Sequence, residues 1–417
     1  MQRRPRGTQD VLPPASTSWQ YVEALARRLA ERFGFQEIRT PVFEHTELFA
    51  RGVGEGTDVV EKEMYTFLDR SGRSLSLRPE STAAVVRALA EAGRLPQREK
   101  VYYLQSHFRY ERPQAGRLRQ HHQFGVEFFG EPSPYADAEV IVLAVTILRA
   151  LGLSAFEVRL NSLGDAQCRP AYREALVAFL RSREEAFCDD CRRRLATNPL
   201  RVLDCKVPGC VAARQGHPEA RDYLCEACRE HLRGVLSLLE AQGVPVCLDA
   251  EVVRGLDYYT RTVFEIVGTE GTYALVGGGR YDHLAEALGA PPTPAVGFGL
   301  GVERLLEALG RQGLLPPPRP PAFVLVAIAA EEVAEVAFRL AMAFREAGVA
   351  TDYAFPGRSL KSQMRLAHRL GVPYVAIVGK EEAASGTVTL RRLADGEEQR
   401  VDRTWAVEIL RREVEAR

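Results

Sequence analysis

Apolar residues recur along the chain with two spacings, one typical of helices and one typical of strands. Between 19 and 33 they recur every three to four positions, which predicts an amphipathic helix. Gly34 ends that pattern, and the segment 35–40 is predicted to form a strand that stops at Pro41. The chain therefore begins with a helix followed by a short strand.

Longer strands are predicted further along the chain. Segments 101–111 and 121–129 are rich in β-branched and aromatic residues and flank a basic, turn-prone loop, which predicts a long antiparallel hairpin. Segments 251–267 and 273–276 are also strand-like. Because these strands follow one another without regular helical crossovers, we expect an α+β domain built on a mostly antiparallel sheet.

Composition along the chain suggests where the domains begin and end. Residues 165–246 have a helical pattern between strand-like flanks, so we interpret them as a mainly helical insertion into a first domain spanning 1–318. The proline-rich segment 316–321 predicts a stiff, extended linker. Beyond it, strands and helices alternate over 322–417, which predicts an α/β domain with a largely parallel sheet.

Charge and hydropathy exclude several classes of protein. The 417 residues include 55 Lys and Arg against 55 Asp and Glu, so no net charge draws the chain to DNA or to a membrane. No apolar run approaches the length of a membrane-spanning helix, and the basic start lacks the apolar stretch of a secretory signal. We therefore expect a cytoplasmic protein, in which eight cysteines more often serve as thiols or metal ligands than as disulfides.

The predicted hairpin carries charged residues that suit an anionic ligand. Arg109 and Glu111 share one face of the first strand, and Gln123 and Glu127 share one face of the second. Arg117 lies in the loop between them. Arginines placed in this way can bind phosphate oxygens bidentately, which indicates a polyphosphate ligand. A solvated basic loop with cross-strand ion pairs is the alternative.

Two further regions combine glycine with charged or aromatic residues. In 297–304 every second residue of a predicted strand is glycine, which leaves one face open to a flat ring, and Arg304 would begin the next helix and stack on that ring. The alternative is a strand packed tightly on its neighbour. Segments 254–262 and 277–282 are dense in polar residues, including Arg254, which indicates either a pocket wall or a structural ion-pair cluster.

Glu80 precedes two hydroxyl residues and an apolar run predicted to be helical. A carboxylate in this position can cap the helix by accepting backbone N–H groups. It can equally receive the ammonium group of a ligand. The sequence leaves both roles open.

Two Cys-x-x-Cys pairs within the insertion predict a tetrahedral structural Zn²⁺ site. The four predicted ligands are Cys188, Cys191, Cys225 and Cys228. Cys205 and Cys210 lie between the pairs and leave the choice of ligands open, and reduced thiols without metal are the alternative. Cys168 and Cys247 are interpreted as small buried hydrophobic residues.

Taken in order, these segments resemble the class II aminoacyl-tRNA synthetases, and among them the histidyl-tRNA synthetases. The strand ending at Pro41, the hairpin with its Phe-Arg-Tyr-Glu at 108–111, and 297–304 resemble the three motifs of the class. The peptides at 254–259 and 278–282 resemble the two peptides that distinguish histidyl enzymes. The resemblance covers nearly the whole chain.

The resemblance implies an activity and a set of partners. The family joins L-histidine to ATP, assisted by Mg²⁺, to form histidyl-adenylate and pyrophosphate, and then transfers histidine to the 3′ end of tRNA(His). Its first motif forms a homodimer interface, and its C-terminal domain binds the anticodon. No membrane or DNA partner is implied.

The resemblance also assigns roles to individual residues. Arg109 would bind the α-phosphate and the histidine carboxylate region, with Arg254 over the same phosphate. Arg117 and Arg304 would hold the outer phosphates, Arg304 would also stack on adenine, and Glu111 belongs to the same ATP site. The implied histidine-binding residues are Glu80, Thr82 and Gln123 for the α-amino group, Glu127 and Tyr259 for the imidazole, and Tyr258 and Tyr281 as pocket lining. A carboxylate and a phenol suit imidazole, whose two nitrogens present a donor and an acceptor or two donors.

Three rival interpretations remain. A non-catalytic regulatory paralogue that partners ATP phosphoribosyltransferase typically lacks the anticodon domain and has decayed motifs, whereas this chain continues past Pro321 and retains Arg109, Arg254 and Arg304. A tRNA-binding module in stress signalling would not need an intact ATP pocket. Another class II synthetase is opposed by the two histidyl-type peptides.

We expect Arg254→Ala to slow histidine-dependent ATP–pyrophosphate exchange strongly while the protein stays folded. The physical reason is that phosphoryl transfer depends on cations fixed around the developing charge. Exchange assays together with circular dichroism would check this. Near-wild-type exchange in the variant would count against the role.

Overall fold

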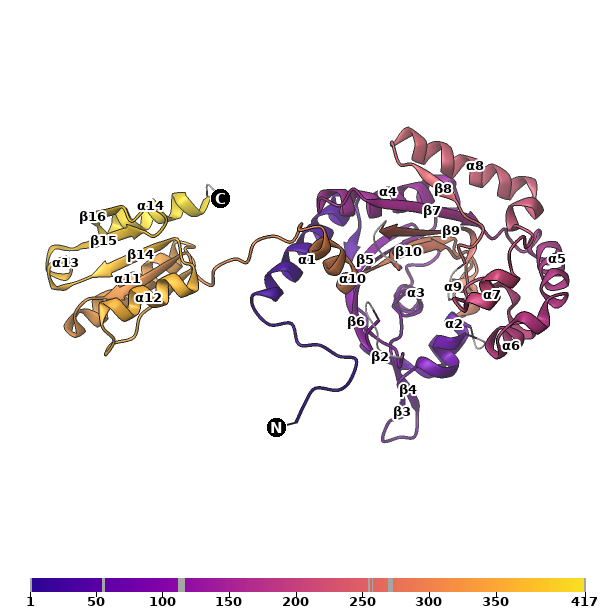
Figure 1. Ribbon diagram of the computed structural model, residues 1–417, viewed down its shortest axis with the longest axis horizontal. Coiled ribbons are helices and arrows are strands. Elements are labelled where there is room, and N and C mark those ends of the chain that lie inside the picture. The colour runs from indigo at the N-terminus through magenta and orange to yellow at the C-terminus, as the bar shows by residue number, and fades with distance from the viewer. Residues whose placement is uncertain are drawn as a thin grey trace. The chain divides into compact units, whose positions relative to one another are not determined.

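The computed structural model of the chain contains two compact units, Met1–Pro316 and Pro317–Arg417 (Figure 1). The residues it describes are 2–54, 57–111, 117–253, 256, 258–268 and 273–415. The division between the units falls within the proline-rich segment 316–321.

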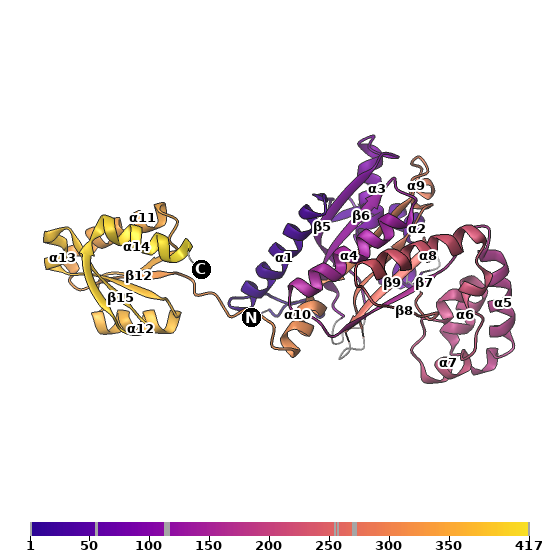
Figure 2. The same cartoon turned by 90° about the horizontal axis from the view of Figure 1, so that it is seen from above.

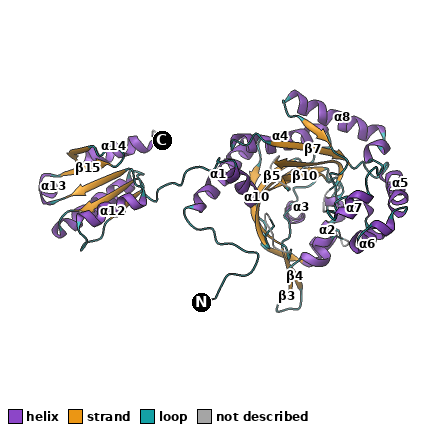
Figure 3. Cartoon of the chain, in the orientation of Figure 1, coloured by secondary structure: helices purple, strands orange, loops and turns teal. Residues whose placement is uncertain are grey.

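The first unit is built on an eight-stranded sheet with the order β1-β5-β6-β11-β10-β9-β7-β8 (Figure 3). Its strands are β1 (Gln36–Glu37), β5 (Glu99–Phe108), β6 (Gln120–Phe129), β7 (Phe156–Ser162), β8 (Val246–Leu248), β9 (Thr260–Gly268), β10 (Ala274–Arg280) and β11 (Ala295–Gly301). All inner pairs are antiparallel, and only the outermost pairs, β1–β5 and β7–β8, are parallel. The predicted mostly antiparallel sheet and its long hairpin are confirmed.

Two strands are shorter than the sequence pattern indicated. The segment 35–40 contributes only the two residues of β1. The strand predicted over 251–267 begins only at Thr260, since the Val252 N–H donates to the Asp249 carbonyl and turns the chain before it. An apolar pattern cannot distinguish such a turn from extended backbone, because both bury the same side chains.

Helices cover both faces of this sheet. On one face α1 (Ala15–Arg32), α4 (Pro134–Ala150), α8 (Glu226–Ala241) and α10 (Val302–Arg311) share a buried apolar core with the central strands (Figure 2). On the other face α3 (Thr82–Glu91) packs through Val85, Val86 and Leu89. Among the described residues, no helix has the length and apolar character needed to cross a membrane.

Smaller elements complete the first unit. A second sheet has the order β2-β4-β3, formed by β2 (Phe43–His45), β3 (Thr66–Leu68) and β4 (Ser74–Leu77). It is accompanied by α2 (Thr46–Val53), η1 (Val59–Glu63) and α9 (Leu284–Ala287). None of these elements is predicted by the sequence pattern, because each is too short to show a period of its own.

The segment between β7 and β8 is mainly helical. It contains α5 (Arg169–Arg181), η2 (Glu184–Ala186), α6 (Asp189–Thr197), η3 (Pro199–Val202), α7 (Pro208–Ala213), η4 (Ala220–Tyr223) and α8. Because β7 and β8 are neighbours in the sheet, these helices leave the sheet and return to the same edge.

The second unit has a five-stranded sheet with the order β13-β12-β14-β15-β16. Its strands are β12 (Val324–Ile328), β13 (Thr351–Tyr353), β14 (Tyr374–Val378), β15 (Thr387–Arg392) and β16 (Glu398–Asp402), and its helices are η5 (Glu331–Val333), α11 (Ala334–Glu346), α12 (Leu360–Leu370), α13 (Lys380–Ser385) and α14 (Arg403–Glu415). The first three strands are parallel, as expected, and β15 and β16 are antiparallel additions.

A buried ion pair fastens the helix layer to the central sheet. Arg280, at the end of β10, contacts Asp137 of α4 at 3.1 Å (Nε to Oδ2), and both side chains are fully buried. His231 of α8 lies 3.2 Å from the same carboxylate. Burial alone would raise the pKa of Asp137, but the charge of Arg280 and the hydrogen bonds from His231 and Arg280 lower it overall.

We expect Asp137→Asn to lower the free energy of unfolding by about 3 kcal/mol, because it removes the fully buried counter-charge of the Arg280 guanidinium and leaves it beside the partly exposed Asp282 carboxylate at 3.1 Å. Chemical denaturation of the two proteins at neutral pH measures the difference. Glu47→Gln, which removes one partner of an exposed ion pair with Arg51, is the matched control and should change little. Equal effects of the two substitutions would contradict this account.

Candidate active site

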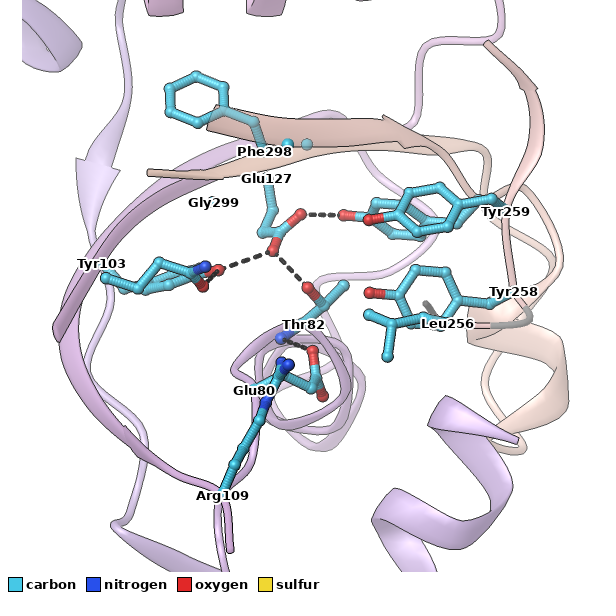
Figure 4. A pocket seen from close by; sticks show the side chains of 14 residues that line it. Glu80, Thr82, Tyr103, Arg109, Glu127, Leu256, Tyr258, Tyr259, Phe298 and Gly299 are labelled. Atoms are coloured by element: carbon cyan, nitrogen blue, oxygen red, sulfur yellow. Dashed lines mark hydrogen bonds between the residues drawn. The ribbon is translucent and has the colours of Figure 1, made fainter. Parts of the chain in front are cut away.

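One cavity of about 60 Å³ opens between α3 and the strands at the centre of the large sheet (Figure 4). Its walls come from segments that are far apart in the sequence. They are formed by Glu80, Thr82, Tyr103, Arg109, Gln123, Glu127, Leu256, Tyr258, Tyr259, Gly277, Tyr281, Gly297, Phe298 and Gly299. The lining combines carboxyl, hydroxyl and guanidinium groups, so the cavity is suited to a polar ligand.

The carboxyl group of Glu127 is buried in the wall of this cavity. Its Oε1 accepts hydrogen bonds from Thr82 Oγ1 at 2.8 Å and from Tyr103 OH at 3.4 Å, and its Oε2 accepts one from Tyr281 OH (Figure 4). Burial raises the pKa of Glu127 to about 8, although the hydrogen bonds from Tyr281 and Thr82 oppose the rise. A ligand nitrogen that donates a proton or carries positive charge would favour the ionised form of this carboxyl.

Glycines on β11 make room for the side chains of β6. Gly297 pairs with Glu127 across the sheet, and a Cβ atom on Gly297 would lie 2.0 Å from Glu127 Oε2. A Cβ atom on Gly299 would lie 2.2 Å from Gln123 Nε2. The side chains of Glu127 and Gln123 therefore occupy part of the space beside these two glycines, although both glycines still line the cavity. The approach of a flat ring to this face stays a prediction.

Glu80 caps α3 and also lines the cavity, so its binding of a ligand ammonium group stays a prediction. Its Oε2 accepts the Thr82 N–H at 2.6 Å and its Oε1 accepts the Ala83 N–H at 3.0 Å, so it caps the first turn of α3. It also lines the cavity, where burial raises its pKa in spite of these hydrogen bonds. The cap holds a carboxyl group in a fixed orientation at the cavity wall.

Arg109 brings a permanent positive charge to the cavity. It follows β5 directly, and its Nε donates to the Pro79 carbonyl at 2.8 Å, which turns the guanidinium toward Glu80 (Figure 4). Because the backbone carbonyl uses only Nε in this contact, the two terminal nitrogens point away from it, in the geometry that binds carboxylate or phosphate.

Histidines beside Arg109 remain neutral. Burial lowers the pKa of His121 to about 3, with further lowering from the charges of Arg109 and Arg304. Burial likewise places the pKa of His107 well below its usual value. Positive charge on this side of the site therefore comes from the arginines at every ordinary pH.

Sequence reasoning missed two residues of this site. Tyr103 lines the cavity and donates to both Glu127 and Gln123. His121 lies where Arg109 and Arg304 both act on it. The alternation of side chains along each strand could have identified both residues. Tyr103 is an even number of residues from Arg109 and is therefore expected on the same face, and His121 is likewise expected on the face of Gln123 and Glu127.

The structure brings together some of the predicted site residues and leaves others outside. Arg109 and all seven predicted histidine-binding residues line the one cavity. Glu111 and Arg117 lie outside its lining and pair with each other at 3.4 Å. Arg304 lies in the first turn of α10, as expected, and donates to the Ala274 carbonyl at 3.0 Å, with its guanidinium 5.2 Å from the Tyr273 ring centre. Arg254 lies outside the described residues.

The four predicted zinc ligands are not gathered at one point. Cys188 and Cys191 lie with Cys205 and Cys210, whereas Cys225 and Cys228 lie with Asp165 and Cys168. The single four-cysteine set is wrong because η3 and α7, which fold between the pairs, supply partners of their own to the first pair. Cys168 is buried, as expected, but Cys247 is exposed.

Comparisons with known proteins agree with this arrangement. The family model described as "Histidyl-tRNA synthetase" matches residues 7–305, and the model "Anticodon binding domain" matches residues 322–413. Proteins named histidine–tRNA ligase are 48% identical over 96% of this chain and 97% of theirs in Caldanaerobacter subterraneus subsp. tengcongensis, and 50% identical over 98% of both in Desulforudis audaxviator. The crystal structure of apo S. aureus histidyl-tRNA synthetase superposes with a TM-score of 0.83, at 35% identity over 99% of this chain and 100% of that one.

An antiparallel catalytic sheet with a polar cavity, followed by an anticodon-binding domain, defines a class II aminoacyl-tRNA synthetase. Within that class, the chain belongs to the histidyl-tRNA synthetase family.

We expect the stability of the wild type relative to Glu127→Gln to fall as pH rises from about 5 to about 8. An unfolded glutamate loses its proton near pH 4.3, whereas burial raises the pKa of Glu127 to about 8, so only the folded wild type holds the proton in this window and its stability falls through it. Glutamine does not titrate. Denaturant unfolding at several pH values should show the free energy of unfolding of the wild type, minus that of the variant, falling by more than about 1.4 kcal/mol, the equivalent of one pKa unit.

Glu286→Gln is the control, because this exposed carboxylate pairs only loosely with His283 at 3.9 Å. A stability difference between the wild type and Glu127→Gln that stays constant from pH 5 to pH 8 would show that the carboxyl ionises normally and is not shielded from water.

Proposed function

We propose that this protein is a histidine–tRNA ligase, which activates L-histidine with ATP to histidyl-adenylate and then transfers histidine to tRNA(His). The observation that carries this proposal is the enclosed carboxyl group of Glu127, held by three hydroxyl groups inside a cavity whose other wall presents Glu80 and Arg109. Such a cavity offers one acid for a side-chain nitrogen, another for an α-ammonium group and a cation for a carboxylate.

The imidazole is assigned to Glu127 and the neighbouring phenols. One imidazole nitrogen can share a proton with the Glu127 carboxyl, whichever partner carries it, since the raised pKa of that carboxyl lies near the range in which imidazole titrates. The rings of Tyr258 and Tyr259 contact each other at a centre distance of 4.7 Å, tilted by 48°, and form an aromatic wall for the flat ring. A site that hydrogen-bonds both ring nitrogens rejects apolar analogues by leaving its own polar groups unpaired.

The backbone end of histidine is assigned to the opposite wall. Glu80, Thr82 and Gln123 would bind the α-ammonium group, because they supply the remaining acceptor oxygens of the cavity. Arg109 would then lie beside the histidine carboxylate and the ATP α-phosphate. That arrangement brings the attacking oxygen and the phosphorus together while a fixed cation neutralises both anions.

The ATP triphosphate is assigned to charged groups outside the cavity. Arg117 and Arg304 would hold the outer phosphates, and Arg304 would stack on adenine. Arg254 would lie over the α-phosphate, opposite Arg109. Mg²⁺ supplies charge neutralisation to the phosphates, and the Glu111 carboxylate is an oxygen donor of the kind this ion prefers.

Other parts of the chain support the remaining partners. In the second unit Lys361, Arg365 and Arg369 recur every four residues on α12 and would contact the tRNA anticodon.

The exposed rings of Phe43 and Phe67 on the small sheet suit a homodimer interface. The insertion is proposed to bind structural zinc, and the balanced charge of the chain suits a cytoplasmic enzyme.

ATP–pyrophosphate exchange across a panel of amino acids, followed by charging of tRNA(His), tests the proposal. We expect exchange with histidine alone, and Glu127→Gln should lower kcat/KM for histidine by about 100-fold, because it replaces an acid with an amide that cannot share a proton with imidazole. Glu286→Gln should behave like the wild type. Exchange with another amino acid, or none in a folded protein, would contradict it, and the second outcome would favour a non-catalytic paralogue.

A further inference from the structure

Four cysteines of the insertion converge on one point. Cys188 precedes α6, Cys191 lies in its first turn, Cys205 follows η3 and Cys210 lies in α7. Their four sulfur atoms all lie within 4.8 Å of one another. Thiolates around one Zn²⁺ at about 2.3 Å are separated by about 3.8 Å, so this cluster needs to contract by at most about 1 Å to hold the ion.

A second, separate cluster forms where the insertion leaves and rejoins the sheet. The Sγ atoms of Cys168 and Cys228 are 3.8 Å apart, and Asp165 Oδ1 lies 3.4 Å from the first of them. The Sγ atom of Cys225 lies 3.8 Å from the same carboxylate oxygen. These separations already match the edges of a tetrahedron around a metal ion, with three sulfur ligands and one oxygen ligand.

The backbone prepares both clusters for negatively charged sulfur. The Cys188 N–H donates to Cys210 Sγ at 3.2 Å, and the Asp165 N–H donates to Cys168 Sγ at 3.2 Å. Cys188 and Cys225 each lie at the N-terminus of a helix, α6 and α8, where the peptide dipoles favour thiolate. Two clusters that share these features independently are difficult to explain as the chance packing of thiols.

Two residues beside the second cluster have backbone conformations in the left-handed region. Gly164 has a φ of +68°, and a Cβ atom there would lie 2.4 Å from Cys168 Sγ. Arg261 of β9 has a φ of +47° and contacts Asp165 Oδ2 through Nη2 at 3.4 Å. The guanidinium orients the carboxylate and offsets part of the negative charge that three thiolates and a carboxylate bring together.

We propose that the insertion holds two zinc ions at separate sites, one bound by Cys188, Cys191, Cys205 and Cys210 and the other by Asp165, Cys168, Cys225 and Cys228. Zinc is the expected metal because it takes four tetrahedral sulfur-rich ligands, and a cluster of several iron atoms would hold the thiolates farther apart than a single ion does. The first site ties α6 to α7 within the insertion, and the second ties the starts of α5 and α8 to β9.

The second site lies next to the wall of the proposed histidine pocket. Arg169, which follows Cys168, donates through Nη1 to the carbonyl oxygen of Tyr259 at 3.1 Å. Tyr259 lines the cavity. Loss of the second zinc should therefore raise KM for histidine, an effect that rests on the proposed function, whereas loss of the first should not.

Zinc content of the full-length protein tests the inference without any assay of activity. The protein is purified without a polyhistidine tag or chelator, and metal is measured by plasma mass spectrometry and native mass spectrometry. We expect two zinc ions per chain, one in Cys205→Ser, one in Cys225→Ser, none in the double variant and two in Cys247→Ser, whose exposed thiol belongs to neither cluster.

Several outcomes would overturn the inference. A protein that holds fewer than two zinc ions per chain after titration with zinc would contradict it. Iron with labile sulfide in the purified protein would also contradict it, as would a single zinc ion that is lost equally in Cys188→Ser and Cys225→Ser. If a variant fails to fold, the same question is answered by alkylating the cysteines of the wild-type protein with and without a chelator. Chelation should expose Cys188 and Cys225 together with their cluster partners, and equal alkylation in both conditions would show that the thiols bind no metal.

Discussion

The carboxyl group of Glu127 is the constraint to which the rest of the catalytic unit is fitted. A carboxyl group without water costs free energy unless its oxygens find hydrogen-bond donors. Here the donors come from α3, β5 and the residue that follows β10. Those elements must therefore meet at one place, and the glycine at 297 must lack a side chain for them to do so.

The position of that meeting point also depends on a buried ion pair. Tyr281, which donates to Glu127, directly follows Arg280, and Arg280 is paired with Asp137 inside the helix layer. A shift of α4 would move Arg280 and, because Tyr281 is the next residue, would also displace the Tyr281 hydroxyl from Glu127. The ion pair contributes placement more than net stability, since buried pairs gain little over well-packed apolar residues.

Charge is divided between the inside and the rim of the site. Burial keeps Glu127 largely protonated, and it keeps His121 and His107, neither of which lines the cavity, neutral. At the rim, Arg109 and Arg304 are permanently positive. This division suits a reaction that joins an amino acid to a polyanion, because the side chain of the amino acid meets a largely protonated carboxyl while the phosphates remain near fixed cations.

The sequence by itself determined the elements with strong periods and the residue types of the site. The long hairpin, the helix at 360–370 and the strand at 374–378 follow directly from patterns of apolar residues, and the seven residues assigned to histidine by resemblance line one cavity. Short elements such as β2 and the turn before β9 could not be predicted, because a few residues carry no period.

Only the tertiary structure decided which distant residues meet. The glycines of β11 were interpreted as a platform for a ring, yet they accommodate Glu127 and Gln123 from the neighbouring strand. The cysteine pairs were joined into one site, yet each pair has partners of its own. In both cases the spacing along the chain specifies a local shape, whereas the contacting atom comes from a segment whose position depends on the packing of the whole sheet.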